Sequence, residues 1–540
     1  MTSAIELPTR TKHVILLGTM LGLMVAASNQ TVLSTALPRI VTDLGGLELL
    51  SWVFTGYMLT STIIVPIAGK LSDLYGRKPF FLTGVALFMI ASIAGGAAQS
   101  MEQLIAVRAV QGLGGGMLIS SSSAIIGDMF APEERGRYQG YYISMFGVAS
   151  ILGPTMGGFI TDYLSWRGIF YMNLPFGIAA LFLVGTRFPR IAARDLRLPI
   201  DWTGVGLLAA TLVCLLLALA WAGDVYAWES PEIAGLLGTA GLLLLVLLYV
   251  ESKAADPVLP LHLFGNRVFA VCSALTFLSG VTLVGVLTFM PLFLQGVLGA
   301  SATSSGLVIS PMMIAVVVAS NAGGRIATGS QRLRWPIVIG SALIVAGMYV
   351  LAHFTATTTW PEAIVGMVLV GVGIGLSVTI VTVAVQNSSP PRHLGVATSS
   401  TQFFRSIGST LSVAIFGTLI VTGIQSNLDR NLPANVTEAA PAALVTRLHD
   451  ADVILSAQGR QDIEQDFLDL GPQGATLYDQ ARVAIEKSLA DAVVQVFVAG
   501  FIVAAIALAL SFLVPDRARG EKARAAGAEG QATESQTAAS

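Results

Sequence analysis

The chain has 540 residues, of which 54% are hydrophobic and only 11% are charged, and its formal net charge at pH 7 is −2. Soluble globular proteins carry about 25% charged residues, so this composition argues strongly against a soluble enzyme of this length. The slightly negative balance gives no reason to expect a nucleic-acid partner.

Long stretches without Asp, Glu, Lys or Arg recur along the chain and predict a membrane protein with many spans. A helix crosses the bilayer core with about 20 apolar residues, and the polar N-terminus without a cleavage site predicts no cleaved signal peptide. The expected fourteen spans are 14–34, 52–69, 80–98, 102–126, 138–161, 167–186, 203–221, 233–250, 268–290, 302–322, 335–353, 362–386, 395–421 and 489–514.

Basic residues are distributed unevenly over the short connections between these spans. Most of the 30 Lys and Arg residues fall on the side that holds both termini, in connections such as 70–78 and 187–197. The opposite short connections hold Arg39 and Arg167. Because short cytoplasmic loops are enriched in Lys and Arg, we expect both termini in the cytoplasm and the chain in the plasma membrane.

The predicted spans divide the chain into five parts. These are a cytoplasmic N-terminus (1–13), a six-helix bundle (14–190), a linker with two extra membrane helices (191–266), a second six-helix bundle (267–514) and a cytoplasmic tail (515–540). The tail is expected to be disordered. The second bundle includes an outer loop at about 425–487, where the spacing of Ile463, Phe467 and Leu468 suggests short amphipathic helices. We favour a solvated loop with little function.

The connection between the second and third spans reads Gly-Lys-Leu-Ser-Asp-Leu-Tyr-Gly-Arg-Lys at 69–78. It resembles the loop signature of the major facilitator superfamily, which implies a cytoplasmic gate. Gly69 would permit close helix contact, and Asp73 could cap a helix end or pair with a loop Arg. Arg77 and Lys78 would anchor at lipid phosphates. A tight turn alone would account for Gly76 and Lys78, but not for the whole pattern.

The fourth span contains Arg-Ala-Val-Gln-Gly-Leu-Gly-Gly-Gly at 108–116, which resembles the R-x-x-Q-G motif of the same superfamily. A guanidinium inside a membrane helix is costly and marks a functional position by default. Gln111 and Gly112 share a face with Arg108, so this face is polar and suited to a water-filled cavity. The alternative is that Arg108 extends to the outer headgroups.

The fifth span contains Gly-Val-Ala-Ser-Ile-Leu-Gly-Pro-Thr-Met-Gly-Gly at 147–158, which resembles the G-x(5)-G-P-x-x-G-G motif of antiporters in the superfamily. Pro154 would kink the helix, because proline removes one backbone hydrogen bond. A plain packing seam of small residues is the alternative. The glycines would let the helix bend and pack closely: Gly147, Gly153, Gly157 and Gly158.

Three shorter stretches, 29–40, 166–175 and 201–204, narrow the resemblance to the fourteen-helix drug:proton antiporter branch. The resemblance covers roughly 14–421 and 489–514. It implies an all-α membrane protein with two six-helix bundles, two linker helices inserted between them, and a substrate site near the bilayer midplane.

The chain departs from that branch at Asn29, where the family usually has Asp. An amide cannot titrate, and we find no carboxylate in the middle of any span, because Glu102, Asp128 and Asp162 lie near helix ends. Proton coupling would then be absent or would use a carboxylate at the edge of a cavity. Residues considered for transport or coupling are Asn29, Thr31, Arg108, Gln111 and Arg405.

Arg405 lies within the thirteenth span, which suggests an internal partner or a cavity, although it could also extend to the headgroups. Cys214 and Cys272 both fall in apolar segments, which excludes a disulfide framework and a CxxC metal site. We expect no cofactor. Further candidates for lining the cavity are Trp52, Tyr57, Tyr142, Asn173, Gln402 and Phe403.

The resemblance implies a secondary transporter that exports hydrophobic or amphipathic compounds by alternating access, driven by proton antiport. Buried arginines without buried acids favour neutral, zwitterionic or anionic amphiphiles over organic dications. Alternatives are a lipid or lipid-precursor exporter, an uncoupled facilitator because of Asn29, and a transceptor whose outer loop binds a partner. The sequence has no Walker A, HExxH or GxSxG pattern, which argues against an enzyme. We expect a functional monomer whose partners are substrate, protons and the bilayer.

Overall fold

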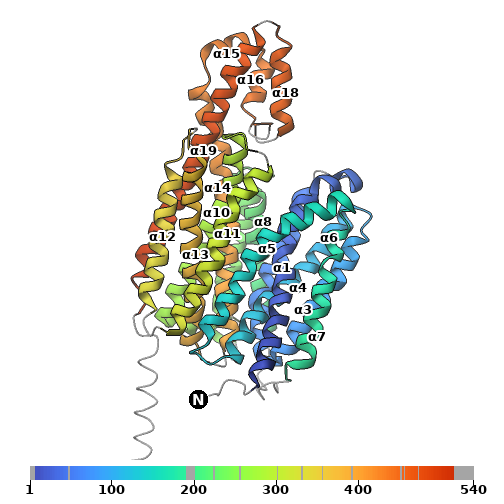
Figure 1. The fold of residues 1–540 in the computed structure, drawn as a ribbon, viewed down its shortest axis with the longest axis vertical. Helices are drawn as coiled ribbons and strands as arrows, with labels where there is room; N and C mark the ends of the chain where they lie inside the picture. Colours follow the sequence, from blue (N-terminus) through green and yellow to red (C-terminus); the bar gives the residue numbers. More distant parts are fainter. Residues whose placement is uncertain are drawn as a thin grey trace, which may run out of the picture.

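The computed structural model is almost entirely helical, and most of its helices run side by side (Figure 1). Among the residues it describes, fourteen helices are long and apolar enough to cross a membrane, which agrees with the predicted spans. It describes residues 7–46, 49–189, 201–222, 225–254, 257–258, 260–300, 302–329, 333–355, 357–390, 393–450, 453–454, 457–471 and 473–515. The predicted disordered tail lies outside these residues from position 516 onward.

The first bundle contains the first six predicted spans. Its helices are α1 (Thr9–Leu44), α2 (Leu50–Tyr75), α3 (Arg77–Gly96), α4 (Met101–Met129), α5 (Arg135–Tyr163), α6 (Gly168–Tyr171) and α7 (Asn173–Arg187). The single predicted span at 167–186 is interrupted at Met172, so α6 and α7 share it. Helix α4 packs against α1, α2 and α3, and α5 packs against α1.

The second bundle contains the last six predicted spans. After a short 3-10 helix, η2 (Leu261–Gly265), its helices are α10 (Arg267–Gly296), α11 (Ala302–Gly329), α12 (Arg334–Ala352), α13 (Trp360–Ser388), α14 (Leu394–Asn431) and α19 (Gly474–Ser511). Helix α13 begins with a capping box, in which the Thr359 and Glu362 side chains satisfy free N–H groups. Helix α13 packs on α11 and α12, and α10 packs on α14 and α19.

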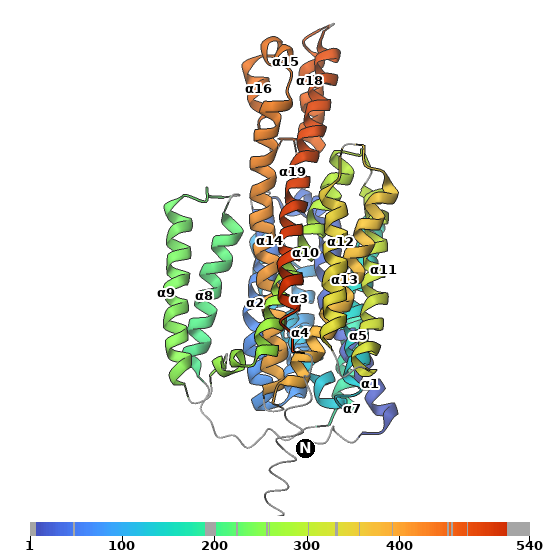
Figure 2. The same cartoon turned by 90° about the vertical axis from the view of Figure 1, so that its left-hand side faces the viewer.

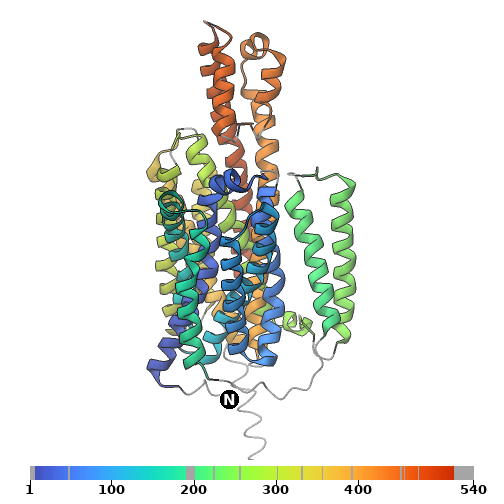
Figure 3. The same ribbon diagram turned by 90° about the vertical axis from the view of Figure 1, so that its right-hand side faces the viewer.

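Two linker helices, α8 (Trp202–Trp221) and α9 (Pro231–Lys253), form a hairpin at one side of the two bundles (Figures 2 and 3). Helix α8 contacts α2 and α14, whereas α9 packs on α8. Helix α9 carries a row of exposed apolar side chains that includes Leu242, Leu245 and Tyr249. Such an apolar face suits contact with lipid tails. The backbone tolerates this contact because the helix satisfies its own N–H and C=O groups.

The outer segment at about 425–487 is helical and is not a solvated loop. Helices α14 and α19 extend beyond the neighbouring helices, and α15 (Ala434–Ala439), α16 (Ala442–Leu448) and α18 (Ala457–Leu468) pack around their ends (Figure 1). Ile463 and Phe467 are fully buried there, whereas Leu468 is exposed. The suggested amphipathic pattern therefore forms helices that bury one face against α19, with Arg447 and Asp466 paired on the outside.

The helices alternate in direction, so the two ends of the bundles are easily distinguished. We call the end at which α1 begins and α2 finishes the N-terminal end, and the opposite one the far end. Gly76 separates α2 from α3 with a φ of 97°, a conformation that side-chain-bearing residues rarely adopt. The two bundles meet mainly through α5 with α11 and α2 with α14.

Candidate functional site

Arg108 is fully buried in α4, at the centre of a polar cluster in the first bundle. Its guanidinium donates from Nε to the Val53 carbonyl at 3.2 Å and from Nη1 to the Asn29 and Gln111 side-chain oxygens. The Tyr57 ring lies 4.4 Å from the guanidinium carbon, a cation–π arrangement. The Arg108 side chain therefore does not extend to the headgroups. It is held by α1, α2 and α4 inside packed protein, where the sequence predicts a water-filled cavity.

The cluster continues from Arg108 into α3 and α7. Gln111 donates from Nε2 to the Ser92 hydroxyl at 2.8 Å, and Asn173 donates from Nδ2 to the same hydroxyl at 3.5 Å. Asn29 and Asn173 also line a small cavity of about 10 Å³, room for roughly one water molecule. Arg108 Nη2 has no hydrogen-bond partner among the described residues. The other four lining residues of the cavity, Val32, Leu33, Ile169 and Phe170, are apolar.

The glycine motif of α5 packs on two sides. Thr31 donates from Oγ1 to the Ala149 carbonyl at 3.4 Å and lies against Gly153, so α1 approaches α5 there. On another face, a Cβ at Gly147 would meet a Val317 side-chain carbon of α11 at 2.5 Å. A Cβ at Gly158 would meet nothing within 4 Å. Gly157 is buried, and the Pro154 side chain lies outside the described part of α5.

The predicted gate motif joins the two bundles at the N-terminal end. The Asp73 carboxylate accepts hydrogen bonds from the backbone N–H groups of Gly395, at 3.1 Å, and Val396, at 2.9 Å. These N–H groups belong to the first turn of α14, where a helix has free donors and a partial positive charge. Asp73 therefore caps a helix of the opposite bundle, one of the two roles the sequence suggests for it. Gly69 allows this approach, because a Cβ there would overlap the Ser399 side chain.

Arg77 is buried beside Asp73 and holds it in place. Its guanidinium pairs with Asp73, donates from Nε to Asp128 at 2.8 Å and donates from Nη1 to the Ser72 hydroxyl at 2.7 Å. Lys78 donates from Nζ to the Phe188 carbonyl at 2.6 Å, just after the last residue of α7, and so caps the C-terminal end of that helix. Anchoring of Arg77 at lipid phosphates is thus wrong, since its guanidinium is buried and engaged by protein acceptors. Anchoring of Lys78 stays a prediction.

A second group of polar contacts across the bundles was not predicted. Arg135 donates from Nη1 to the Asn387 side-chain oxygen at 3.3 Å, and Gln386 donates from Nε2 to the Ser123 carbonyl at 3.3 Å. The backbones of Gly136 and Gly324 lie so close that a Cβ on either residue would overlap the carbonyl oxygen of the other. The sequence Gly-Arg-Ile-Ala-Thr-Gly-Ser-Gln-Arg at 324–332 faintly resembles the gate motif, and it is a sequence signal that could point to this contact.

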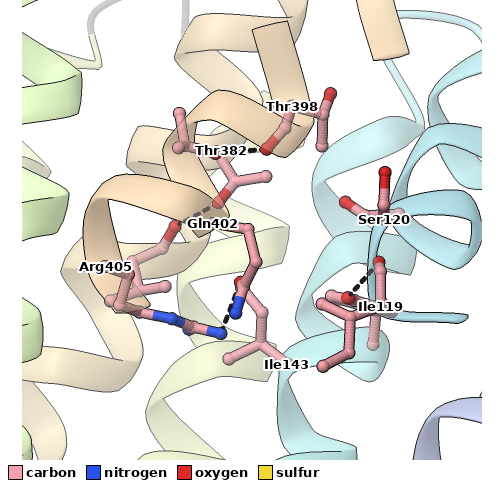
Figure 4. A pocket seen from close by; sticks show the side chains of 11 residues that line it. Ile119, Ser120, Ile143, Thr382, Thr398, Gln402 and Arg405 are labelled. Carbon is pink, nitrogen blue, oxygen red and sulfur yellow. Dashed lines mark hydrogen bonds between the residues drawn. The ribbon is translucent and has the colours of Figure 1, made fainter. Parts of the chain in front are cut away.

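A small polar cavity of about 20 Å³ lies between the bundles, farther from the N-terminal end than these contacts. Figure 4 shows Gln402 and Arg405 of α14 on one wall, opposite Ile119 and Ser120 of α4. Arg405 donates from Nη2 to Gln402 Oε1 at 2.5 Å. The lining residues are Ile119, Ser120, Ser123, Tyr142, Ile143, Val378, Thr382, Thr398, Thr401, Gln402 and Arg405.

Apart from the glycine motif of α5 with Thr31, most of the predicted site residues form three separate groups. Tyr142, Gln402 and Arg405 share the cavity between the bundles, where the Arg405 guanidinium also lies 5.1 Å from the Phe146 ring. The Arg108 cluster and the gate motif are the other two groups. Phe403 packs instead into an apolar cluster with side chains of α2 and α8. Trp52 lies away from all three groups, with its ring 5.8 Å from that of Trp221.

Comparison with known proteins adds independent information. The family model described as Major Facilitator Superfamily matches residues 19–413. The Bacillus subtilis (strain 168) "Multidrug transporter protein MdtP" is 38% identical over 411 residues, which cover 76% of this chain and 75% of that protein. "Multidrug resistance protein 3" of the same organism is 37% identical over 458 residues, 85% of this chain and 89% of that protein.

Solved structures resemble the chain more distantly. The crystal structure of the human organic anion transporter MFSD10 (TETRAN) aligns with a TM-score of 0.56 and 14% sequence identity, and the match covers 92% of this chain and 100% of that one. At this identity the likeness speaks for the fold alone. It agrees with the two-bundle arrangement of Figure 1.

Proposed function

Because the chain belongs to the major facilitator superfamily, a family of transporters and not of enzymes, we propose that it exports hydrophobic or amphipathic compounds as a secondary active transporter. The observation that carries this proposal is the capping of α14 by Asp73, which holds the two bundles together at the N-terminal end, beyond a small polar cavity between them. The named multidrug relatives support the same substrate class.

The closed end supports an alternating-access cycle. Among the described residues, the hydrogen bonds that join the two bundles lie toward the N-terminal end, from Asp73 with Val396 to Ser144 with Asn321. Rocking of one bundle against the other would break these bonds and open the cavity to that side. Hydrogen bonds to a charged group contribute about 1.5–3 kcal/mol each, so substrate and ions can shift the balance between the two states.

The chemistry of the polar cavity points to neutral, zwitterionic or anionic groups on the substrate. Arg405 and Gln402 supply donors, Tyr142 supplies an aromatic wall, and no lining residue is an acid. An organic dication would meet the Arg405 guanidinium without a compensating carboxylate, which is unfavourable in a cavity of low dielectric. Export of a lipid or lipid precursor remains the nearest alternative within this chemistry.

Proton antiport is the energy source that we propose, with the coupling carboxylate elsewhere than at position 29. Asn29 accepts a hydrogen bond from Arg108, and its amide has no titratable proton. Asp128 is a better candidate, because it pairs with Arg77 beside the gate and is partly exposed. The amide at position 29 also favours a second candidate function, an uncoupled facilitator in which the substrate gradient alone drives flux.

The orientation that we propose places the N-terminal end in the cytoplasm. Lys70, Lys78, Arg135 and Arg137 lie near the helix ends that its short connections join, whereas the far end has Arg39 and Arg167 near its own connections. This excess of basic residues is typical of cytoplasmic loops. The chain would then lie in the plasma membrane as a functional monomer, closed to the cytoplasm in the state described above.

Flux measurements in proteoliposomes test this function. Purified protein is reconstituted, and efflux is followed for ethidium, rhodamine B and carboxyfluorescein, with and without an imposed pH gradient. We expect saturable efflux that favours the zwitterionic and anionic dyes and that increases with the gradient. Protein-free liposomes and Arg405→Ala protein are the controls. Efflux that equals the protein-free rate for every dye would refute the proposal, and gradient-independent efflux would favour the facilitator.

A further inference from the structure

A second, much larger cavity of about 470 Å³ lies at the seam between the bundles, behind α8. It shares no lining residue with the polar cavity and occupies the half of the molecule toward the far end. Its walls come from α2, α8, α10 and α14, and they consist of Phe54, Thr55, Met58, Leu59, Leu216, Leu219, Ala220, Ala222, Phe289, Leu292, Thr410, Val413, Ala414, Gly417, Thr418, Ile420 and Val421.

The lining of this lateral cavity is apolar and contains no charged side chain. Its polar side chains are threonines, and two of them are engaged within α14. Thr410 donates to the Ser406 carbonyl at 3.1 Å, and Thr418 donates to the Ala414 carbonyl at 3.0 Å. Thr418 also accepts a hydrogen bond of 2.5 Å from the Trp228 indole N–H. A ligand would therefore find hydrocarbon and aromatic contacts and few free donors.

The size and the surroundings of the lateral cavity fit a small molecule that comes from the bilayer. Pockets for small molecules are usually about 300–1,000 Å³, and apolar walls gain packing contacts from a hydrophobic occupant. Its outer wall, α8, belongs to the hairpin that stands apart from the bundles (Figures 2 and 3), so membrane lies close to the cavity.

We propose that the lateral cavity is a second binding compartment, which takes the uncharged aromatic or aliphatic body of a compound dissolved in the membrane. The inference rests on the proposed function and extends it. The polar cavity would select the headgroup of a substrate, and the lateral cavity would hold an apolar body before or after transfer. One helix, α14, carries both Arg405 and the wall that includes Thr410.

The lateral cavity also depends on the state of the gate. Its α2 wall belongs to the first bundle, and its α10 and α14 walls belong to the second. Asp73 fixes the other end of α2 to the start of α14. Opening the N-terminal end would move these walls relative to each other, so the cavity is expected to hold its ligand best while the gate is closed.

Gly417 offers a substitution that fills the cavity without a clash. A Cβ at this position would meet nothing within 4 Å, although the residue lines the cavity. Gly206, on α8, is a matched control, because its Cβ would also meet nothing within 4 Å and it lies outside the lining. The full-length protein is placed in lipid nanodiscs, and binding of the neutral dye N-phenyl-1-naphthylamine is followed by its fluorescence.

We expect dye affinity to fall at least tenfold in Gly417→Trp and to remain unchanged in Gly206→Trp. Gly417→Ala and Gly417→Leu should give smaller, graded losses in order of side-chain volume, which keeps the test valid if the Trp variant folds poorly. Equal affinity in all Gly417 variants would overturn the proposal. A phospholipid that copurifies and that the dye does not displace, as detected by mass spectrometry, would also overturn it.

This experiment separates the two proposals. Dye binding in nanodiscs needs no flux, so a protein that binds the dye in the expected order but transports nothing would refute the proposed function alone. Conversely, normal flux of carboxyfluorescein with equal dye affinity in the Gly417 variants would refute the lateral compartment alone.

Discussion

The carboxylate of Asp73, near the end of α2, accepts a hydrogen bond of 2.9 Å from the backbone N–H of Val396, in the first turn of α14. A side chain of one bundle thus completes the helix of the other, and this capping is possible only while the N-terminal end is closed. Arg77 and Asp128 keep the carboxylate aimed at α14. A short motif in one connection therefore controls a contact between two halves of the molecule.

Asp73→Asn should reduce flux about tenfold, because an amide accepts hydrogen bonds less strongly than a carboxylate, and hydrogen bonds to charged groups contribute about 1.5–3 kcal/mol. Dye affinity in the polar cavity should change little, since that cavity does not include position 73. Flux and equilibrium binding are measured on the same purified protein. Asp43→Asn is the control, because the exposed Asp43–Arg167 pair contributes little and an amide oxygen can still accept the hydrogen bond from the Trp166 indole N–H. Full flux in Asp73→Asn would remove the gate role.

Arg108→Ala should abolish flux, and Arg108→Lys should restore only part of it. The guanidinium donates hydrogen bonds to Val53, Asn29 and Gln111 at the same time, whereas an ammonium acts as a point charge on a flexible stem. Proteoliposome efflux gives the rate, and size-exclusion chromatography with the thermal midpoint shows whether the variants remain folded. A folded Lys variant with flux near that of the wild type would mean that the planar group is not needed.

Asn29→Asp should make efflux depend more steeply on the pH gradient. The new carboxylate would face Arg108 Nη1, the group that now donates to the Asn29 oxygen, and it could bind and release a proton, which the amide cannot. Export of cationic dyes such as ethidium should improve, because the acid offsets a buried positive charge. Efflux is measured against imposed pH difference for both proteins. Equal dependence on the pH difference in both proteins would contradict this prediction and would leave a carboxylate such as Asp128 to carry the proton alone.

Gly69→Val should hold the N-terminal end open, because a side chain there would overlap Ser399 of α14. Flux should fall by at least tenfold, as expected when a bulky residue enters a packed helix contact at a cost of about 1–3 kcal/mol. Gly185→Val is the matched control, since the nearest atom to its Cβ would be a Leu82 carbon at 3.8 Å. Equal flux in both variants would show that close approach at position 69 is not required.

The fourteen spans were predictable because the bilayer requires about 20 apolar residues for each helix, and the gate motif was predictable because its residues are contiguous. Contacts such as that between Gln386 and Ser123 were not, since they join residues distant in the chain and follow no local pattern. Arg77 was assigned to lipid because a basic residue next to a connection suits a phosphate, and its burial between Asp73 and Asp128 follows from the packing of α2, α3 and α4. The lateral cavity depends on how α8 packs, which hydropathy does not encode.

The extension of α14 and α19 beyond the membrane was not predicted either. The predicted spans stop at 421 and begin at 489 because apolar runs end there, yet both helices continue as α14 to Asn431 and as α19 from Gly474. Asn431 and Ser488 join them by a hydrogen bond of 3.1 Å. Hydropathy marks the membrane boundary and not the end of a helix, so helical length outside the bilayer needs tertiary packing to be known.

Opening and closing of the N-terminal end can be measured as a change in the distance between the two bundles. Tyr75 at the end of α2 and Trp335 at the start of α12 are both exposed there, and they can carry spin labels as cysteines once Cys214 and Cys272 are replaced by alanine. Pulsed electron paramagnetic resonance in nanodiscs should give a short distance for the closed state. Asp73→Asn should add a longer distance, and Asp43→Asn should not. A single unchanged distance in all three proteins, with and without rhodamine B, would contradict a gate that Asp73 closes.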